Sequence, residues 1–156
     1  MIKILNFAFL KLCDSISLFF VFAGEDAVNE HNLKPIARLV GYSYVGVDPS
    51  IMGIGPVPAI EAVLKNAGLN KDEVGVYDIN EAFAPQFLAC EKALELDTEK
   101  TNVCGGAIAL GHPLAASGSR ITAHLAHALQ RTGEKYAVGS ACIGGGQGIA
   151  VLLEKC

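Results

Sequence analysis

The sequence predicts a layered α/β domain in which a largely parallel or mixed β-sheet is flanked by helices. Apolar runs of strand length recur along the chain, and amphipathic stretches with helical spacing lie between them. The 17 glycines gather at the bends rather than forming a linker. Strands that alternate with helices build layered α/β sheets, and 156 residues suit one domain with its own core.

The first 23 residues are strongly apolar and rich in phenylalanine. Residues 16–23 form a nearly continuous apolar run, which predicts a strand covered on both faces. A secretory signal peptide is the alternative, because an early basic residue precedes the apolar stretch and its end resembles a cleavage site. Lys11 and Asp14 interrupt the stretch and exclude a clean membrane span. We therefore leave the status of residues 1–23 open and assign residues 24–156 to the domain.

Helices and strands alternate over the rest of the chain. The predicted helices have apolar residues three or four apart and are bounded by residues that suit helix ends. Gly68 is expected as a C-cap, and Ser117 or Ser119 as an N-cap. Gly41 and Gly46 predict bulges or close backbone approaches within a strand. The expected order is a helix at residues 25–31, a strand at 36–47, a helix at 57–67, a strand at 74–79, helices at 83–94 and 117–131, and strands at 135–141 and 147–153.

The bulk composition excludes several classes of protein. A formal net charge of −4 provides no electrostatic footprint for nucleic acid or for an anionic membrane surface. Five cysteines, an odd number without a C-x-x-C pair, indicate reduced thiols in an intracellular compartment rather than disulfides or structural zinc. The sequence lacks the motifs of simple nucleotide-binding proteins, serine hydrolases and zincins.

Two glycine-rich bends near the end of the chain each carry a group that could move an acyl group. His112 lies between Gly111 and Pro113, ahead of a predicted helix whose N-terminus favours a neutral imidazole. Cys142 follows a predicted strand and precedes three glycines, of which Gly144 is the first. Such glycines let the backbone present N–H groups to a developing oxyanion. The alternatives are an ordinary loop histidine and a small buried thiol.

Other polar residues lie at a strand end and on a helix. Asn80 follows the predicted strand at residues 74–79, and α/β folds place ligands at the carboxyl ends of strands. Its amide could orient a water, or it could cap the next helix; Glu81 could anchor the loop or cap the same helix. His124 and His127 could chelate a metal, but without a third ligand we expect a solvated helix face instead.

Four short motifs stand in order along the chain. They are GIGPVP at residues 53–58, NEAFA at residues 80–84, NVCGGAIALGHP at residues 102–113 and CIGGGQG at residues 142–148. Together they resemble the C-terminal half of the thiolase family, and the likeness is strongest to the 3-ketoacyl-CoA thiolases of mitochondrial type. It runs from about residue 24 to residue 153. The resemblance implies a thiolase-like C-terminal domain with a layered mixed sheet.

The resemblance also implies catalytic roles, position by position. His112 would activate the nucleophile and help to hold the substrate thioester oxygen, and Asn80 would fix a water in the same oxyanion hole. Cys142 would be the acid/base group that moves the proton at the α-carbon. The N–H of Gly144 would serve a second oxyanion hole.

Substrates and partners follow from the same resemblance. Ala82 and Phe83 would lie near the pantetheine or acyl group of an acyl-CoA, so coenzyme A is a substrate, and neither a further cofactor nor a metal is expected. Thiolases form dimers or tetramers, which implies a homo-oligomer or pairing with another thiolase subunit, without nucleic acid or membrane as partner. A role in fatty acid β-oxidation would place the protein in the mitochondrial matrix or the cytoplasm.

The chain departs from the family in its cysteines. Thiolases consist of two similar halves, and the first half, which carries the cysteine that becomes acylated, has no counterpart in this sequence. None of Cys13, Cys90, Cys104 and Cys156 stands in the motif of that nucleophile, and Cys104 occupies the place of an asparagine. We therefore expect a thiolase-type acyltransferase, cleaving or forming 3-ketoacyl-CoA, that is inactive or impaired alone. The alternatives are a non-catalytic module that binds acyl-CoA or dimerises with a thiolase subunit, and a truncated product without function.

Overall fold

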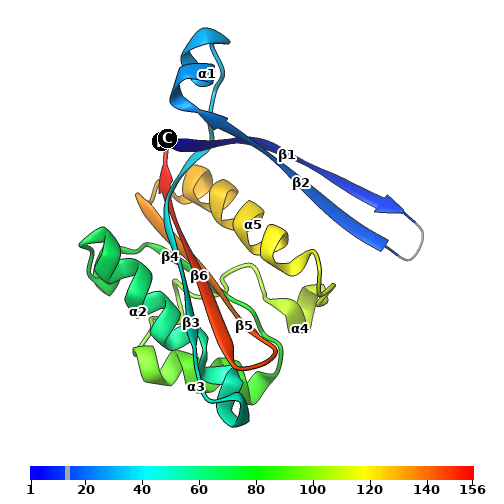
Figure 1. The fold of residues 1–156 in the computed structure, drawn as a ribbon, viewed down its shortest axis with the longest axis vertical. Coiled ribbons are helices and arrows are strands. Elements are labelled where there is room, and N and C mark those ends of the chain that lie inside the picture. The colour runs from blue at the N-terminus through cyan, green and yellow to red at the C-terminus, as the bar shows by residue number, and fades with distance from the viewer. Residues whose placement is uncertain (13–14) are drawn as a thin grey trace.

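The computed structural model describes residues 1–12 and 15–156, with side chains for residues 1–5 and 20–156. In this part of the chain, six strands form one sheet in the order β2-β1-β3-β6-β5-β4 (Figure 1). The pairing is antiparallel except between β4 and β5, which run parallel. The expected mixed sheet is therefore confirmed. The strands are β1 (Ile2–Leu12), β2 (Ser15–Gly24), β3 (Ala37–Gly46), β4 (Val76–Ile79), β5 (Tyr136–Ile143) and β6 (Gln147–Lys155).

Helices cover the two faces of the sheet, as Figure 1 shows. One face packs against α2 and α3, in an apolar cluster that includes Leu152 of β6. The other face packs against α5, in a second cluster that includes Leu153. Successive side chains of a strand point to opposite faces, so these neighbours supply one core each. The helices are α1 (Glu25–Glu30), α2 (Pro56–Ala67), α3 (Ala84–Leu94), α4 (Ala107–Leu110) and α5 (Ser117–Thr132), with 3₁₀ turns η1 (Pro49–Ile54) and η2 (Lys71–Glu73).

Most of the expected elements are confirmed to within a few residues. Gly68 ends α2 in the left-handed conformation (φ 68°), as a C-cap glycine does. The pairing of β3 with β6 shifts register between Leu39 and Gly41, which confirms the bulge expected there. The hydroxyl N-cap expected for α5 is wrong, because Ala116 precedes the helix without a side-chain cap. The hydroxyl of Ser117 has other partners, described below.

The chain begins with a β-hairpin that extends the sheet, because β1 pairs with β2 and, at residues 2–4, with β3. Residues 16–23 lie in a strand, as expected. Coverage on both faces is wrong at the described end of this run, because the neighbours Val21 and Phe22 point to opposite faces and are each 53% exposed. Among the described residues, no helix is long and apolar enough to cross a membrane. Cys13 and Asp14 lie outside the described residues, and the domain boundary after residue 23 stays a prediction.

Two backbone segments touch where β6 begins. A Cβ on Gly148 would overlap the carbonyl of Gly55, at the start of α2, and a Cβ on Gly55 would overlap the backbone of Gln147. This contact holds the turn η1 against the hairpin that joins β5 to β6. Gly46 of the neighbouring strand has open space around it and pairs in register with Gln147, so the irregularity expected at Gly46 is wrong.

We expect Gly148→Ala to lower the free energy of unfolding by about 1–3 kcal/mol, because the added methyl group forces the two backbones apart. Gly46→Ala is the matched control, since its methyl group enters open space and should change stability by less than about 0.5 kcal/mol. Urea unfolding followed by circular dichroism measures both variants. Equal midpoints for Gly148→Ala and the unchanged chain would show that the contact is not tight.

Candidate active site

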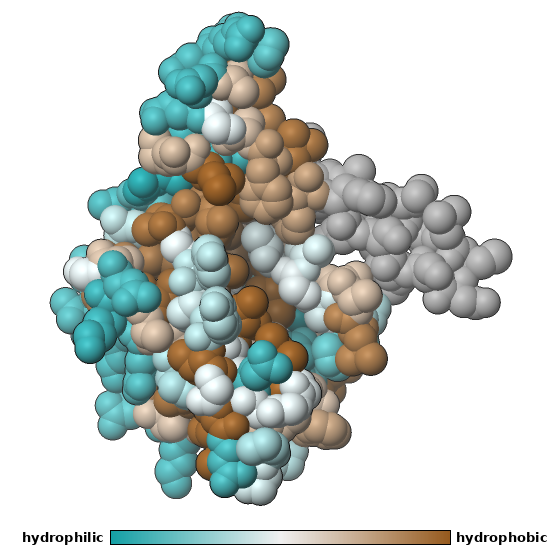
Figure 2. Space-filling view, in the orientation of Figure 1, coloured by the Kyte–Doolittle hydropathy of each residue, from teal (hydrophilic) through white to brown (hydrophobic). Residues whose placement is uncertain are grey.

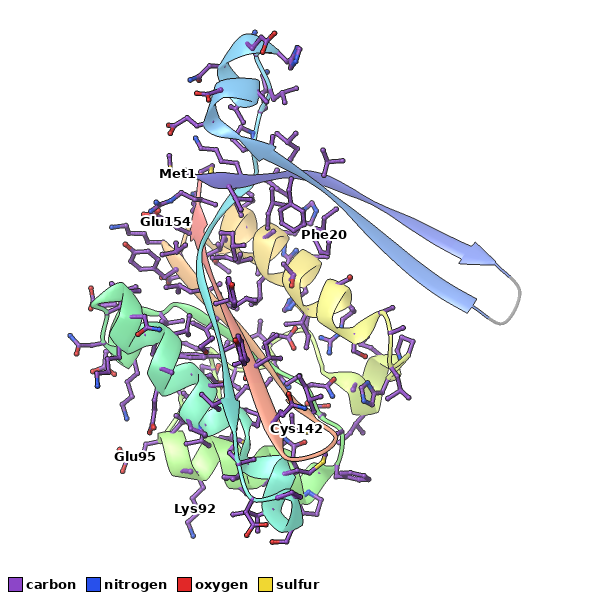
Figure 3. All side chains as sticks on the ribbon, viewed as in Figure 1. Met1, Phe20, Lys92, Glu95, Cys142 and Glu154 are labelled. Carbon is purple, nitrogen blue, oxygen red and sulfur yellow. The ribbon has the colours of Figure 1, made fainter. Side chains whose placement is uncertain are left out.

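The parallel pair β4–β5 brings two of the expected site residues to one edge of the sheet. Ile79 lies opposite Ser140, and the N–H of the next residue, Asn80, donates to the carbonyl of Ser140 at 2.8 Å. Cys142 lies two residues further along β5, near the end of the hairpin (Figure 3). Ligands of α/β folds bind outside the carboxyl ends of parallel strands. This edge is therefore where a substrate would be expected.

His112 reaches the same edge from the loop between α4 and α5. Gly111 before it has φ 96°, a conformation that favours glycine, and this residue turns the chain out of α4. Nε2 of the His112 ring lies 3.5 Å from Nδ2 of Asn80, and Nδ1 lies 2.7 Å from Oγ of Ser117. The imidazole is thus held between the end of β4 and the first residue of α5.

The hydrogen bonds indicate which nitrogen of the His112 ring carries the proton. The hydroxyl of Ser117 donates to the carbonyl of Pro113 at 3.2 Å, so its oxygen is left to accept from Nδ1 of the ring. Nδ1 then holds the proton and Nε2 keeps its lone pair, facing the amide donor of Asn80. This tautomer presents Nε2 as a base.

Asn80 is a buried residue and does not cap the following helix. It is 1% exposed, and the residue that caps α3 is Phe83, so the alternative of an Asn80 cap is wrong. Its Oδ1 is buried and has no hydrogen-bond partner among the described residues. A buried acceptor in this state is costly unless a ligand or water satisfies it. Asn80 therefore suits a site that binds something.

Glu81 anchors the loop that leads to His112. Its carboxylate accepts from Nδ2 of Asn102 at 2.8 Å and from the N–H of Ile108, the second residue of α4, at 3.0 Å. Asn102 in turn exchanges two hydrogen bonds with the backbone of Ile79, at 2.8 and 2.9 Å. These hydrogen bonds therefore tie the end of β4 to the α4 loop, the segment of residues 102–116 that contains α4, next to Asn80.

Cys142 is half-buried, and burial raises the pKa of its thiol. The buried thiol of Cys90 donates to the carbonyl of Gly53 at 3.3 Å. Burial raises the pKa of Cys90 to about 11, and the charge of Cys142 contributes to that rise. Within the described residues, the hydrogen bonds of Asn80 and His112 do not include Cys142. The structure thus brings imidazole and carboxamide into contact, and a pocket shared with the thiol stays a prediction.

The glycine bend after Cys142 turns β5 into β6. Gly145 and Gly146 have φ 85° and 87°, and a Cβ on Gly146 would overlap the carbonyl of Val47. These two positions therefore require glycine. Gly144 is exposed, and its carbonyl accepts from the side chain of Gln147 at 3.2 Å. The role of its backbone N–H as an oxyanion donor stays a prediction.

An apolar groove of about 470 Å³ adjoins the loop that follows Asn80. Phe83, which is 66% exposed, lies on one side of it, and Ala82 beside it is half-buried. Of the two expected substrate-contacting residues, Phe83 lines the groove and Ala82 does not. The side chains that line the groove with Phe83 include Ile51, Met52, Ile54, Pro85 and Gln86.

The solvated helix face expected at His124 is wrong. Nδ1 of His124 lies 2.7 Å from Oδ2 of Asp78, a carboxylate that is fully buried in β4 and that also accepts from Arg120. His127 is half-buried on the same helix. The described residues hold no cluster of three metal-ligating side chains. Sequence reasoning missed Asp78, although an acidic residue inside the apolar run at residues 74–79 is a visible signal.

We expect iodoacetamide at about pH 7.5 to modify Cys142 more slowly than the exposed Cys104, and Cys90 more slowly still. The thiolate is the reactive form, so a raised pKa lowers the reactive fraction at neutral pH and lets it recover as the pH rises. For Cys90 the shift from 9.0 to about 11 reduces that fraction about 100-fold. Mass spectrometry of the labelled peptides across a pH series gives the three rates. Equal rates in guanidinium are the control, and a Cys142 as fast as Cys104 at neutral pH would contradict the raised pKa.

Comparison with known proteins agrees with this geometry. Residues 33–155 match the family model described as "Thiolase, C-terminal domain". The chain is 66% identical over 135 residues to the mitochondrial 3-ketoacyl-CoA thiolase of Mus musculus, and 50% identical over 131 residues to the acetyl-CoA acetyltransferase of Escherichia coli. These alignments cover 86% and 84% of this chain but only 34% and 33% of the two relatives.

A solved structure has the same fold. The crystal structure of human mitochondrial 3-ketoacyl-CoA thiolase in complex with CoA matches with a TM-score of 0.87 and 65% identity, over 88% of this chain and 35% of that one. The chain thus spans about a third of the length of the relatives it matches. The expected thiolase-like fold is confirmed, and the chain belongs to the thiolase family, with residues 33–155 corresponding to its C-terminal domain.

Proposed function

We propose that this chain supplies the acid/base part of a thiolase-type acyltransferase site that cleaves or forms 3-ketoacyl-CoA. The observation that carries the proposal is the arrangement Asn80–His112–Ser117, in which an imidazole faces a buried carboxamide at the edge of the sheet. Cys142 stands on the neighbouring strand at that edge. Base, amide donor and thiol are the groups that thioester chemistry needs.

His112 and Asn80 act on the thiol and the thioester in this proposal. Nε2 of His112 takes a proton from the attacking thiol, and the resulting imidazolium donates to the thioester oxygen as negative charge develops there. Asn80 orients the imidazole through Nδ2, and its buried Oδ1 accepts from a water in the same oxyanion hole. The N–H of Gly144 serves the second oxyanion hole.

Cys142 acts on the carbon. When the bond between the α- and β-carbons of a 3-ketoacyl-CoA breaks, its electron pair stays on the α-carbon of the departing acetyl-CoA, and the S–H of Cys142 supplies the proton. A half-buried thiol with a raised pKa is protonated at neutral pH, which suits this role. In the synthetic direction the thiolate removes the same proton.

The acylated cysteine comes, in our proposal, from residues outside these 156. Cys90 is buried with a pKa of about 11, which makes it a poor nucleophile. Cys104 and Cys156 are exposed, and neither stands in the motif of the family's nucleophile. The relatives are about two and a half times as long as this chain, so they have residues to supply such a group.

Coenzyme A is the proposed substrate carrier, with no further cofactor. The apolar groove at Phe83 would take the pantetheine or acyl portion, because most of its lining is apolar. One structural relative is a complex with CoA. Relatives include mitochondrial and cytosolic enzymes, so we propose the mitochondrial matrix or the cytoplasm as the compartment and fatty acid β-oxidation as the process.

A second candidate is a module that pairs with a thiolase subunit without catalysing. It is favoured by large apolar side chains exposed around the α4 loop, such as Ile108 (65%) and Leu114 (84%). Figure 2 shows apolar surface where Figure 1 places this loop. Exposed apolar patches of this kind mark interfaces or aggregation sites. Under the proposed function, the same surface would meet another part of the complete enzyme.

We expect the purified chain alone to thiolyse acetoacetyl-CoA at least about 10⁴-fold more slowly than a complete thiolase, because the covalent step lacks its nucleophile. The release of acetyl-CoA is measured with free CoA as second substrate. Turnover within tenfold of a complete enzyme would refute the assignment of the nucleophile to residues outside this chain. If the chain shows no sharp thermal transition and binds hydrophobic dyes strongly, the alternative of a truncated product without function is favoured instead.

A chimera tests the roles of the residues directly. Residues 33–155 of this chain replace the matching part of the Mus musculus enzyme, with which the chain shares 66% identity. We expect the chimera to be active and expect His112→Ala or Cys142→Ala to lower kcat by about 10²–10⁴. Cys104→Ala, which removes an exposed thiol, is the matched control and should retain activity. An active chimera that tolerates His112→Ala would overturn the proposal.

A further inference from the structure

We propose that Asp78, Arg120 and His124 are positioning residues that set the placement of His112 and Asn80, an inference that rests on the function proposed above. The carboxylate of Asp78 is 0% exposed in β4. Its two oxygens accept from Nη1 of Arg120 at 3.0 and 2.8 Å, and Oδ2 also accepts from Nδ1 of His124 at 2.7 Å. This buried network joins β4 to α5.

The network lies on the same faces of β4 and α5 as the candidate site. Side chains two residues apart on a strand share a face, so Asp78 and Asn80 both point towards α5. Positions spaced by three and four residues share one face of a helix, so Ser117, Arg120 and His124 form one stripe that faces β4. Two polar layers result: Asp78 with Arg120 and His124, and Asn80 with His112 and Ser117.

A buried ion pair is poorly explained by stability alone. Taking a carboxylate and a guanidinium out of water costs more than packing apolar side chains of similar volume, and such replacements are often neutral or stabilising. The network also leaves Nη2 of Arg120 and Nε2 of His124 buried without a partner among the described residues. Hydrogen bonds are directional, so this network defines the orientation of α5 relative to β4 in a way that apolar packing does not.

Orientation of α5 matters because its first residue holds the imidazole. A helix that slips by one residue over a strand moves by 1.5 Å and turns by about 100°. Such a slip would carry the Ser117 hydroxyl away from Nδ1 of His112, and the bond between them is only 2.7 Å long. Displacements of about 1 Å at a reacting group can cost about 100-fold in rate. Asp78 fixes this register because Arg120 and His124 both bond to it, one helical turn apart.

The state of the His112 ring tests the proposal in the 156-residue chain without any need for catalysis. Nitrogen NMR of the imidazole distinguishes a proton held at Nδ1 from one shared between both nitrogens, and His112→Gln assigns the signals. We expect the unchanged chain to hold the proton at Nδ1. In Asp78→Asn and Arg120→Met, the two nitrogen shifts should converge towards those of a free histidine. Arg120→Lys keeps the charge and should restore the pattern in part.

Arg38→Met is the matched control, because it breaks another partly buried ion pair, with Glu154, at the far end of the sheet. It should lower the unfolding midpoint without changing the His112 shifts. If Asp78→Asn fails to fold, His124→Gln tests the same layer with a smaller change. Unchanged His112 shifts in both Arg120→Met and His124→Gln, at lowered stability, would overturn the proposal and leave the network a purely structural one.

Kinetics in the chimera separate this inference from the proposed function. If both hold, Arg120→Met lowers kcat by about 10- to 100-fold while KM changes by less than about twofold. If His112→Ala leaves the chimera active, the proposed function is wrong, while the NMR result still decides whether Asp78 and its partners position the ring. If the ring shifts of His112 change while kcat does not, the claim that the placement of this ring affects catalysis is wrong.

Discussion

The parallel pairing of β4 with β5 is the constraint on which the candidate site depends. Every other pair in the described sheet is antiparallel, so only here do two neighbouring strands run in the same direction and end at the same edge. Asn80 and Cys142 are 62 positions apart in the sequence, yet the register Ile79–Ser140 sets them within two residues of each other across the pair. A parallel pair needs a long crossover. That crossover contains α3, the α4 loop and α5, and it therefore carries His112 as well.

The loop that holds His112 is fixed by polar contacts at both ends rather than by apolar packing. Glu81 bonds to Asn102 and Ile108 on the approach, and Ser117 bonds to the ring and to Pro113 at the exit. Hydrogen bonds of this kind define direction as well as distance. A loop with many exposed apolar side chains would otherwise have little to select one conformation. The polar anchors thus explain how an exposed segment can present a defined imidazole.

Local sequence signals were sufficient to predict the helices and strands. They could not predict which residues far apart in the sequence bond to each other. Helical spacing and a C-cap glycine were sufficient for α2, and an apolar run bounded by glycines was sufficient for β5. The glycines beside His112 and Cys142 revealed where backbone turns expose a side chain. Ser117 was misjudged because a hydroxyl at a helix start serves as a cap or bonds elsewhere, and only its neighbours decide which. The partners of Asp78 lie 42 and 46 positions away, so nothing local identifies them.

The distribution of charge across the edge explains how a buried ion pair can coexist with the proposed thioester site. In the proposed reaction, the hydrogen bonds of the His112 ring leave Nε2 to accept a proton, and the raised pKa of the Cys142 thiol keeps that group protonated at neutral pH. The full charges of Asp78 and Arg120 lie one layer away and cancel each other. In the proposed reaction, charge therefore develops at the edge only as the bonds change, where N–H donors would stabilise it. A fixed charge at the edge would instead hold water there, and a thioester would have to displace it.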